Sequence, residues 1–246
     1  MSPREYVTAT RQPRYSLTFA LPLLVSYEVL ATTLSQSALD GVRNGADVVL
    51  KTLFVSFGGR AGLATFGLAV IVVGAWLVWR DRRSHPGPLR STVLGAMLLE
   101  SLVYAGCFGI AASGLTALLL GGVPLAATAI AAPTLPLGTQ LVVSLGAGIY
   151  EELLFRVLLV SGLTGLGVLI GWRRSFALAV AVAGSALIFS GFHYVGPLGD
   201  QLALPSFTFR AIAGLLFSGL YVIRGFGIAA WTHALYDVGL ALTVGW

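Results

Sequence analysis

The sequence comprises 246 residues, of which 57% are hydrophobic and only 10% are charged, and its mean hydropathy is +0.88. Soluble domains carry roughly 25% charged residues, so this composition excludes an ordinary water-soluble protein. The formal net charge is +5, but the 15 basic residues fall in short clusters between apolar stretches, which indicates topology signals rather than a nucleic-acid-binding patch. We therefore expect the lipid bilayer as a partner and no nucleic acid.

Apolar stretches separated by charged or helix-breaking residues predict about seven membrane-spanning helices, because about 20 apolar residues suffice to cross a bilayer. Their expected ranges are 15–38, 61–79, 91–120, 138–170, 175–196, 207–223 and 226–245. No internal repeat is evident. The sequence thus predicts an all-α fold, a polytopic transmembrane helical bundle that forms a single domain over residues 1–246.

Residues 40–60, between the first two spans, have a different pattern. Polar and charged side chains alternate there with large apolar ones, and the polar set includes Arg43, Asn44, Asp47 and Lys51. This pattern predicts an amphipathic helix at the membrane interface.

The distribution of basic residues predicts a cytoplasmic N-terminus. Ten of them fall on the side of the N-terminus and four on the other side, and cytoplasmic loops carry the excess of Lys and Arg. The larger group is Arg4, Arg11, Arg14, Arg80, Arg82, Arg83, Arg90, Arg173, Arg174 and Arg224, and the smaller is Arg43, Lys51, Arg60 and Arg210. The first helix is expected to stay uncleaved because many spans follow it. High Ala, Gly and Arg usage suggests a GC-rich bacterium, and hence the bacterial inner membrane.

Ionisable residues inside the expected spans are functional candidates, since a charge at mid-membrane costs at least about 2.5 to 3.5 kcal/mol. They are Glu28, Glu100, Glu151, Glu152, Arg156, His193, His233 and Asp237. Glu28 and Glu100 have no assigned role, and binding to Arg43 or lining a cavity are the alternatives. The one cysteine, Cys107, excludes an intramolecular disulfide and a thiolate metal cluster.

Glu151 and Glu152 are expected to differ in their partners. On an α-helix, Glu152 and Arg156 are four residues apart and share a face, with the glutamate on the N-terminal side, which is the better orientation for an ion pair. Glu151 points about 100° away and has no partner on its own helix. One neutralised and one free carboxylate suit a site in which a single carboxylate gains and loses a proton. A bundle-stabilising ion pair beside a protonated glutamate is the alternative.

Two further motifs carry histidines on later spans. Phe189 and His193 share a helical face, and so do His233 and Asp237. Each pair alone is compatible with an interhelical polar contact, but a glutamate and two histidines on three different spans can converge only inside the bundle. A glutamate with a histidine can activate water, and a further histidine and aspartate can stabilise an oxyanion, which together is what amide hydrolysis needs.

The three motifs, in this order on successive late spans, resemble those of the CPBP (CAAX protease and bacteriocin-processing, or Abi) intramembrane endopeptidases. The resemblance covers about residues 138–245, where it implies the catalytic core of a glutamate-type protease. It implies that Glu151 is the general base and that His193 holds and polarises the water. His233 and Asp237 would bind the oxyanion or orient the scissile carbonyl, and Glu152, Arg156 and Phe189 would support them.

The resemblance implies a membrane-associated protein or peptide as substrate, with bacteriocin leader peptides, C-terminal sorting tags and prenylated tails as the alternatives. We expect no cofactor. Glu151, His193 and His233 with a water would nevertheless satisfy tetrahedral zinc, so a zinc site stays an alternative. Two functions from other classes also stay open, namely a non-catalytic scaffold or immunity protein and an ion-coupled transporter.

Overall fold

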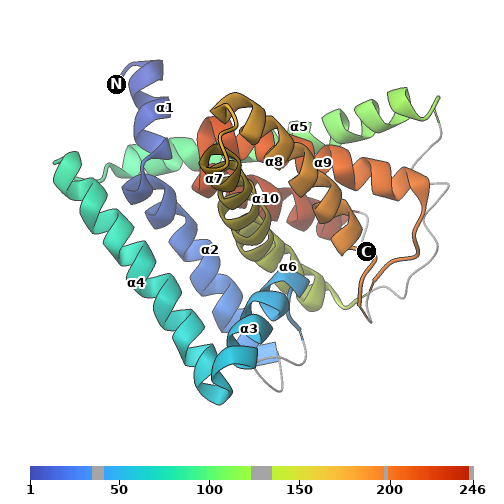
Figure 1. The fold of residues 1–246 in the computed structure, drawn as a ribbon, viewed down its shortest axis with the longest axis horizontal. Helices are drawn as coiled ribbons and strands as arrows, with labels where there is room; N and C mark the ends of the chain where they lie inside the picture. Colours follow the sequence, from blue (N-terminus) through green and yellow to red (C-terminus); the bar gives the residue numbers. More distant parts are fainter. Residues whose placement is uncertain (35–41, 123–134, 197–198, 244–246) are drawn as a thin grey trace.

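The computed structural model describes residues 1–34, 42–122, 135–196 and 199–243 (Figure 1). The described residues form helices and no strands, which confirms the all-α fold class. The elements are α1 (Pro3–Arg11), α2 (Pro13–Leu34), α3 (Gly45–Gly58), α4 (Arg60–Ser84), α5 (Ser91–Leu119), α6 (Leu137–Gly146), η2 (Ala147–Val160), α7 (Ser161–Leu169), α8 (Arg174–Phe192), α9 (Leu204–Arg224) and α10 (Phe226–Thr243). The expected start of the interfacial helix at residue 40 and the outer ends of the first and last expected spans lie outside the described residues.

Six helical segments within the described ranges are long and apolar enough to cross a membrane. They are Pro13–Leu34, Ala61–Ser84, Ser91–Leu119, Leu137–Leu169, Arg174–Phe192 and Leu204–Arg224. These segments correspond to the first six expected spans. Large apolar side chains cover their outer surface, as at Ile110 and Leu118, which are 77% and 78% exposed. Such a surface needs lipid around it, and the protein is a multi-pass membrane protein.

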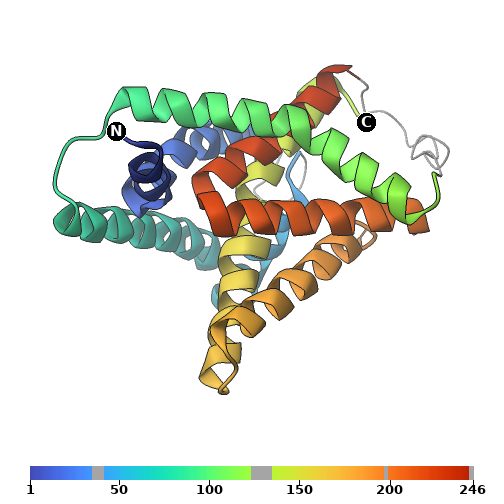
Figure 2. The same cartoon turned by 90° about the horizontal axis from the view of Figure 1, so that it is seen from above.

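The seventh expected span is α10, and it differs from the other six in composition. It is a helix of 18 residues, but within the described part of the chain it is not among the segments apolar enough to count as a span. The helix contacts α2, α5, α6, α9 and η2, and it lies beside α5 in the second view (Figure 2). Because α10 meets other helices rather than lipid, it can carry His233 and Asp237, which lower its hydropathy.

The fourth span changes its helical geometry in the middle. Between α6 and α7, residues Ala147–Val160 form the π-helix η2, whose backbone hydrogen bonds join residues five apart. The expectation of a continuous α-helix is wrong here. Glu152 and Arg156 nevertheless stay on one face, because four residues are still about one turn. Ser185 on α8 donates a 2.7 Å hydrogen bond to the carbonyl of Phe155, so this widened helix is also held from outside. Segments of this kind are rare and often occur at functional sites.

Helix α3 is amphipathic, but its charged face turns inward. Asp47 is fully buried, whereas Val49, Leu53 and Phe57 are exposed, the last at 87%. The charges of α3 thus serve contacts within the bundle, while Val49, Leu53 and Phe57 face outward.

The two acidic residues without an assigned role have basic partners. Glu28 on α2 binds Lys51 at 3.0 Å and lies 3.5 Å from Arg43, the partner that the sequence suggested. Glu100 on α5 binds Arg224 at the end of α9 and accepts a 2.8 Å hydrogen bond from Tyr6 of α1. Both carboxylates therefore hold helices together.

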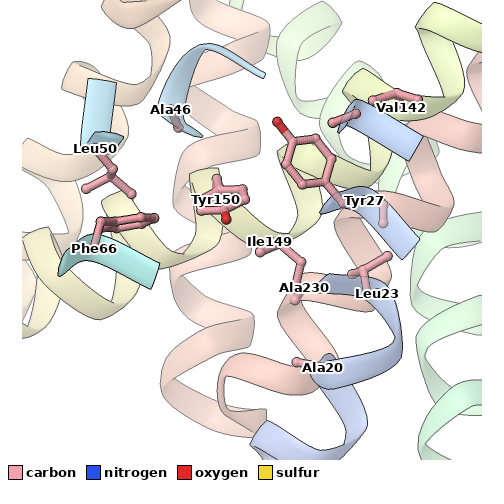
Figure 3. Close-up of a cluster of buried hydrophobic side chains, with 12 residues drawn as sticks. Ala20, Leu23, Tyr27, Ala46, Leu50, Phe66, Val142, Ile149, Tyr150 and Ala230 are labelled. Atoms are coloured by element: carbon pink, nitrogen blue, oxygen red, sulfur yellow. The ribbon is translucent and has the colours of Figure 1, made fainter. Parts of the chain in front are cut away.

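A buried cluster ties α2, α3 and α4 to η2 and α10. Its residues are Ala20, Leu23, Tyr27, Ala31, Ala46, Leu50, Phe66, Val142, Ile149, Tyr150, Ala230 and Ala234. Figure 3 shows Tyr27 and Tyr150 next to each other within this cluster; their ring centroids are 5.3 Å apart in an edge-on arrangement. This packing places the N-terminal half of the bundle against the helix that carries both adjacent glutamates.

Candidate active site

His233 on α10 lies among three carboxylates. Its Nδ1 atom is 2.8 Å from Oε1 of Glu152, and its Nε2 atom is 3.6 Å from Oδ2 of Asp237 and 3.9 Å from Oε2 of Glu151. The first and third expected motifs therefore meet, as the chemistry of the site requires. The contact with Glu152 was not predicted, since the sequence placed only Asp237 on the same helical face as His233.

The close approach of α10 to η2 depends on a glycine. A Cβ atom at Gly148 would lie 2.5 Å from the carbonyl oxygen of Ala230 and 2.6 Å from the Cβ of Ala234. No larger residue fits there without moving one helix, because heavy atoms do not approach this closely. Gly148 thus sets the distance at which His233 faces the two glutamates.

Arg156 forms the expected ion pair with Glu152. Its Nη1 atom lies 3.1 Å from Oε1 of Glu152, and both side chains are completely buried. The guanidinium carbon lies 4.5 Å from the ring centroid of Phe189 and 5.4 Å from that of Phe217. An arginine in such an apolar environment depends on its counter-ion and on the faces of aromatic rings. Arg156 is therefore the counter-ion of Glu152, and Phe189 packs against the guanidinium of Arg156.

Glu151 is bound by a residue from the other half of the chain. The Nδ2 atom of Asn44 donates a 2.8 Å hydrogen bond to its Oε1. Its Oε2 atom, which faces His233, has no hydrogen-bond partner among the described residues. The residue is buried, with 6% of its total surface exposed. This carboxylate thus has one bound oxygen and one oxygen turned toward the histidine.

His193 lies at the C-terminal end of α8, and its hydrogen bond is to the backbone of α8 rather than to Glu151 or His233. Its Nδ1 atom is 2.8 Å from the carbonyl oxygen of Phe189, and the two rings contact edge to face at 4.9 Å. When Nδ1 donates to that carbonyl, Nε2 is left as an acceptor. The ion pair that Glu151 forms within 4 Å is with His233, and His193 is not part of it.

Two residues of the site were not found by sequence analysis as site residues. Phe217 on α9 stacks on the ring of His233, with centroids 4.3 Å apart and planes 22° apart. Asn44 was included only in the amphipathic pattern. An asparagine before a helix indicates an N-cap, but no sequence signal connects it with a glutamate 107 residues later.

The alternative zinc set of Glu151, His193 and His233 can be compared with this geometry. Across the described ranges, no three side chains of His, Cys, Asp or Glu are grouped closely enough to hold a metal ion. Glu151, His193 and His233 have the right chemistry for zinc, so the zinc set stays an alternative.

Fold and site together define a multi-pass helical membrane protein with a buried group of carboxylates and histidines. Residues 133–239 match the family model described as type II CAAX prenyl endopeptidase Rce1-like. This confirms the resemblance to the CPBP, or Abi, family over that part of the chain. The matched segment contains all three motifs. No curated protein and no solved structure matched the chain.

Proposed function

We propose that this protein is an intramembrane endopeptidase that hydrolyses a peptide bond of a membrane-associated substrate with a water activated by Glu151. The observation that carries the proposal is the pair formed by Oε2 of Glu151 and Nε2 of His233. Their separation of 3.9 Å is too long for a direct hydrogen bond. One water molecule can contact both atoms at this distance, which is the arrangement that a general base requires.

In the proposed reaction, Glu151 takes a proton from the water, and the resulting hydroxide attacks the scissile carbonyl carbon. The tetrahedral intermediate carries its negative charge on the former carbonyl oxygen. Glu151 then returns the proton to the leaving amine as the C–N bond breaks, so the base is regenerated. His193, whose Nε2 can accept a hydrogen bond, is the proposed second partner of the attacking water.

His233 is the group that stabilises the oxyanion in this proposal. Donation from Nε2 requires the doubly protonated ring, and the carboxylates of Glu152 and Asp237 on its two nitrogen atoms balance that charge. Stacking on Phe217 fixes the plane of the ring. The side chain of Asp237 is 19% exposed, against 8% for Glu151, which supports entry of the substrate from the side of Asp237.

The proposal also includes the cofactor, the membrane and the type of substrate. The reaction needs no cofactor, and the protein lies in a bacterial inner membrane with the N-terminus in the cytoplasm. Two contacts support this topology: Arg14 donates to the carbonyl oxygen of His85, which follows Arg82 and Arg83 in the chain, and Arg224 donates to that of Val7, between Arg4 and Arg11. A leader peptide or a C-terminal sorting tag is the proposed type of substrate.

Quantitative proteomics of membranes tests the function. Cells producing the wild-type protein are compared with cells producing Glu151→Gln, which keeps the shape of the side chain and removes the base. Glu100→Gln is the matched control, because it also replaces a carboxylate inside a span but lies in the ion pair with Arg224. At equal abundance, we expect one class of membrane protein to accumulate unprocessed with Glu151→Gln only. Normal processing with Glu151→Gln would contradict the proposal and favour a scaffold.

A further inference from the structure

Asn44 uses both ends of its amide group. Its Oδ1 atom accepts a 2.9 Å hydrogen bond from the backbone N–H of Ala46 and thereby caps α3, and its Nδ2 atom donates to Glu151 at 2.8 Å. We propose that Asn44 is a positioning residue that orients the carboxylate of Glu151 for catalysis, an inference that rests on the proposed function.

The geometry around Glu151 explains why such a residue is needed. A carboxylate can rotate about its terminal bond and exchange its two oxygen atoms. The hydrogen bond from Asn44 holds Oε1, so Oε2 is turned toward Nε2 of His233. Without this hydrogen bond, the ionised carboxylate would lose its donor in a buried place, and Oε1 would no longer be held.

The position of Asn44 is itself fixed by the elements around it. Its backbone N–H donates a 3.1 Å hydrogen bond to the hydroxyl of Tyr27, which in turn donates to Asp47 at 2.7 Å. Asp47 is held by Arg43 and Lys51, both at 2.7 Å. The inward charges of α3 therefore serve to hold the start of this helix beside η2.

A glycine on the adjoining helix permits this arrangement. A Cβ atom at Gly146 would lie 2.6 Å from the Cβ of Asn44 and 2.5 Å from Cε2 of Tyr27. The backbone before η2 thus directly contacts the residue that binds Glu151 and the residue that fixes it.

Capping alone does not explain an asparagine here. Asp and Ser cap a helix about as well as Asn, since each provides a side-chain oxygen acceptor. Among these residues, only Asn also offers an amide donor to a carboxylate. Asn44→Ser therefore keeps the cap and removes the amide donor to Glu151, which separates positioning from folding. Asn44→Asp also keeps the cap but places a second carboxylate against Glu151.

The first test measures the turnover of both variants. The substrate is a synthetic peptide spanning the cleavage site found in the proteomic comparison, and the proteins are full-length in lipid nanodiscs. We expect kcat to fall roughly 100-fold in both variants, the loss expected for a misplaced catalytic group, with KM changed by less than about threefold. Wild-type kcat in both variants would overturn the inference, and it would leave the proposed function intact if Glu151→Gln is inactive.

A reversed pair gives a readout that does not depend on activity. In Asn44→Asp/Glu151→Gln, the new glutamine can donate to the new aspartate, so the hydrogen bond is restored with exchanged roles. We expect the double variant to have a higher Tm than Asn44→Asp, while it stays inactive because the base is gone. Additive Tm changes would show that the two side chains are not coupled and would overturn the inference. If Glu151→Gln alone cleaves at the wild-type rate, the proposed function fails and the inference fails with it.

Discussion

The Nδ1 atom of His233 lies 2.8 Å from Oε1 of Glu152, the same oxygen that lies 3.1 Å from Nη1 of Arg156. Glu152 is thus the link between a buried arginine and the histidine of the site. The two adjacent glutamates have different partners in this arrangement: Oε1 of Glu152 contacts Arg156 and His233, whereas Oε1 of Glu151 accepts a hydrogen bond from Asn44.

Replacement of Glu152 by Gln is expected to lower stability and activity together. It leaves the guanidinium of Arg156 buried without a counter-ion, which typically costs about 3 to 5 kcal/mol. Thermal unfolding in detergent measures this loss. The pair Glu152→Gln/Arg156→Met should recover much of the stability, because no isolated charge remains, but not the activity, because His233 stays without its carboxylate. A stable and active Glu152→Gln would contradict this role.

Gly148→Ala is expected to inactivate the protein by pushing α10 away from η2. Its Cβ would lie 2.5 Å from a backbone oxygen, and overpacking of this kind typically costs about 1 to 3 kcal/mol. Gly162→Ala on α7 is the control, since nothing lies within 4 Å of its Cβ position. The control should keep activity and gain up to about 1 kcal/mol from helix propensity. Equal effects of the two substitutions on unfolding would argue against the close contact.

Asp47→Asn should destabilise the bundle strongly. The fully buried carboxylate binds Arg43, Lys51 and Tyr27, so its removal leaves two cations with Glu28 as their remaining acidic partner in the described contacts. The free energy of unfolding is expected to fall by about 3 to 5 kcal/mol. Asp200→Asn serves for comparison, because Asp200 is 49% exposed in its ion pair with Arg210, and such exposed pairs contribute about 1 kcal/mol or less. If both variants unfold alike, the charges of α3 do not lie inward as described.

Metal chelation is expected to leave turnover unchanged. The described residues contain no three-residue group with metal-binding geometry, and the proposed base is Glu151 itself. Purified protein is treated with 1,10-phenanthroline and assayed alongside elemental analysis. Loss of activity that zinc restores, with about one zinc per chain, would replace the metal-free proposal by the zinc alternative.

Much of this architecture follows from local sequence properties. The six membrane-crossing segments were predicted because apolar composition acts over 20 residues, and the ion pair of Glu152 with Arg156 was predicted because it depends on spacing within one helix. The contact of His233 with Glu152 could not be predicted, because it depends on how α10 packs on η2 around Gly148. The link from Asn44 to Glu151 depends likewise on the inward turn of α3, whose amphipathic pattern does not reveal which face meets the bundle.

The most direct test of the central claim uses isotope-labelled water. Purified protein in nanodiscs cleaves the identified peptide in H₂¹⁸O, and mass spectrometry follows the new C-terminus. With the wild type, the account predicts one ¹⁸O atom in the new carboxylate, and with Glu151→Gln a cleavage rate lower by about two to four orders of magnitude. Cleavage by Glu151→Gln at the wild-type rate, or a new C-terminus without the label, would contradict hydrolysis by a water that Glu151 activates.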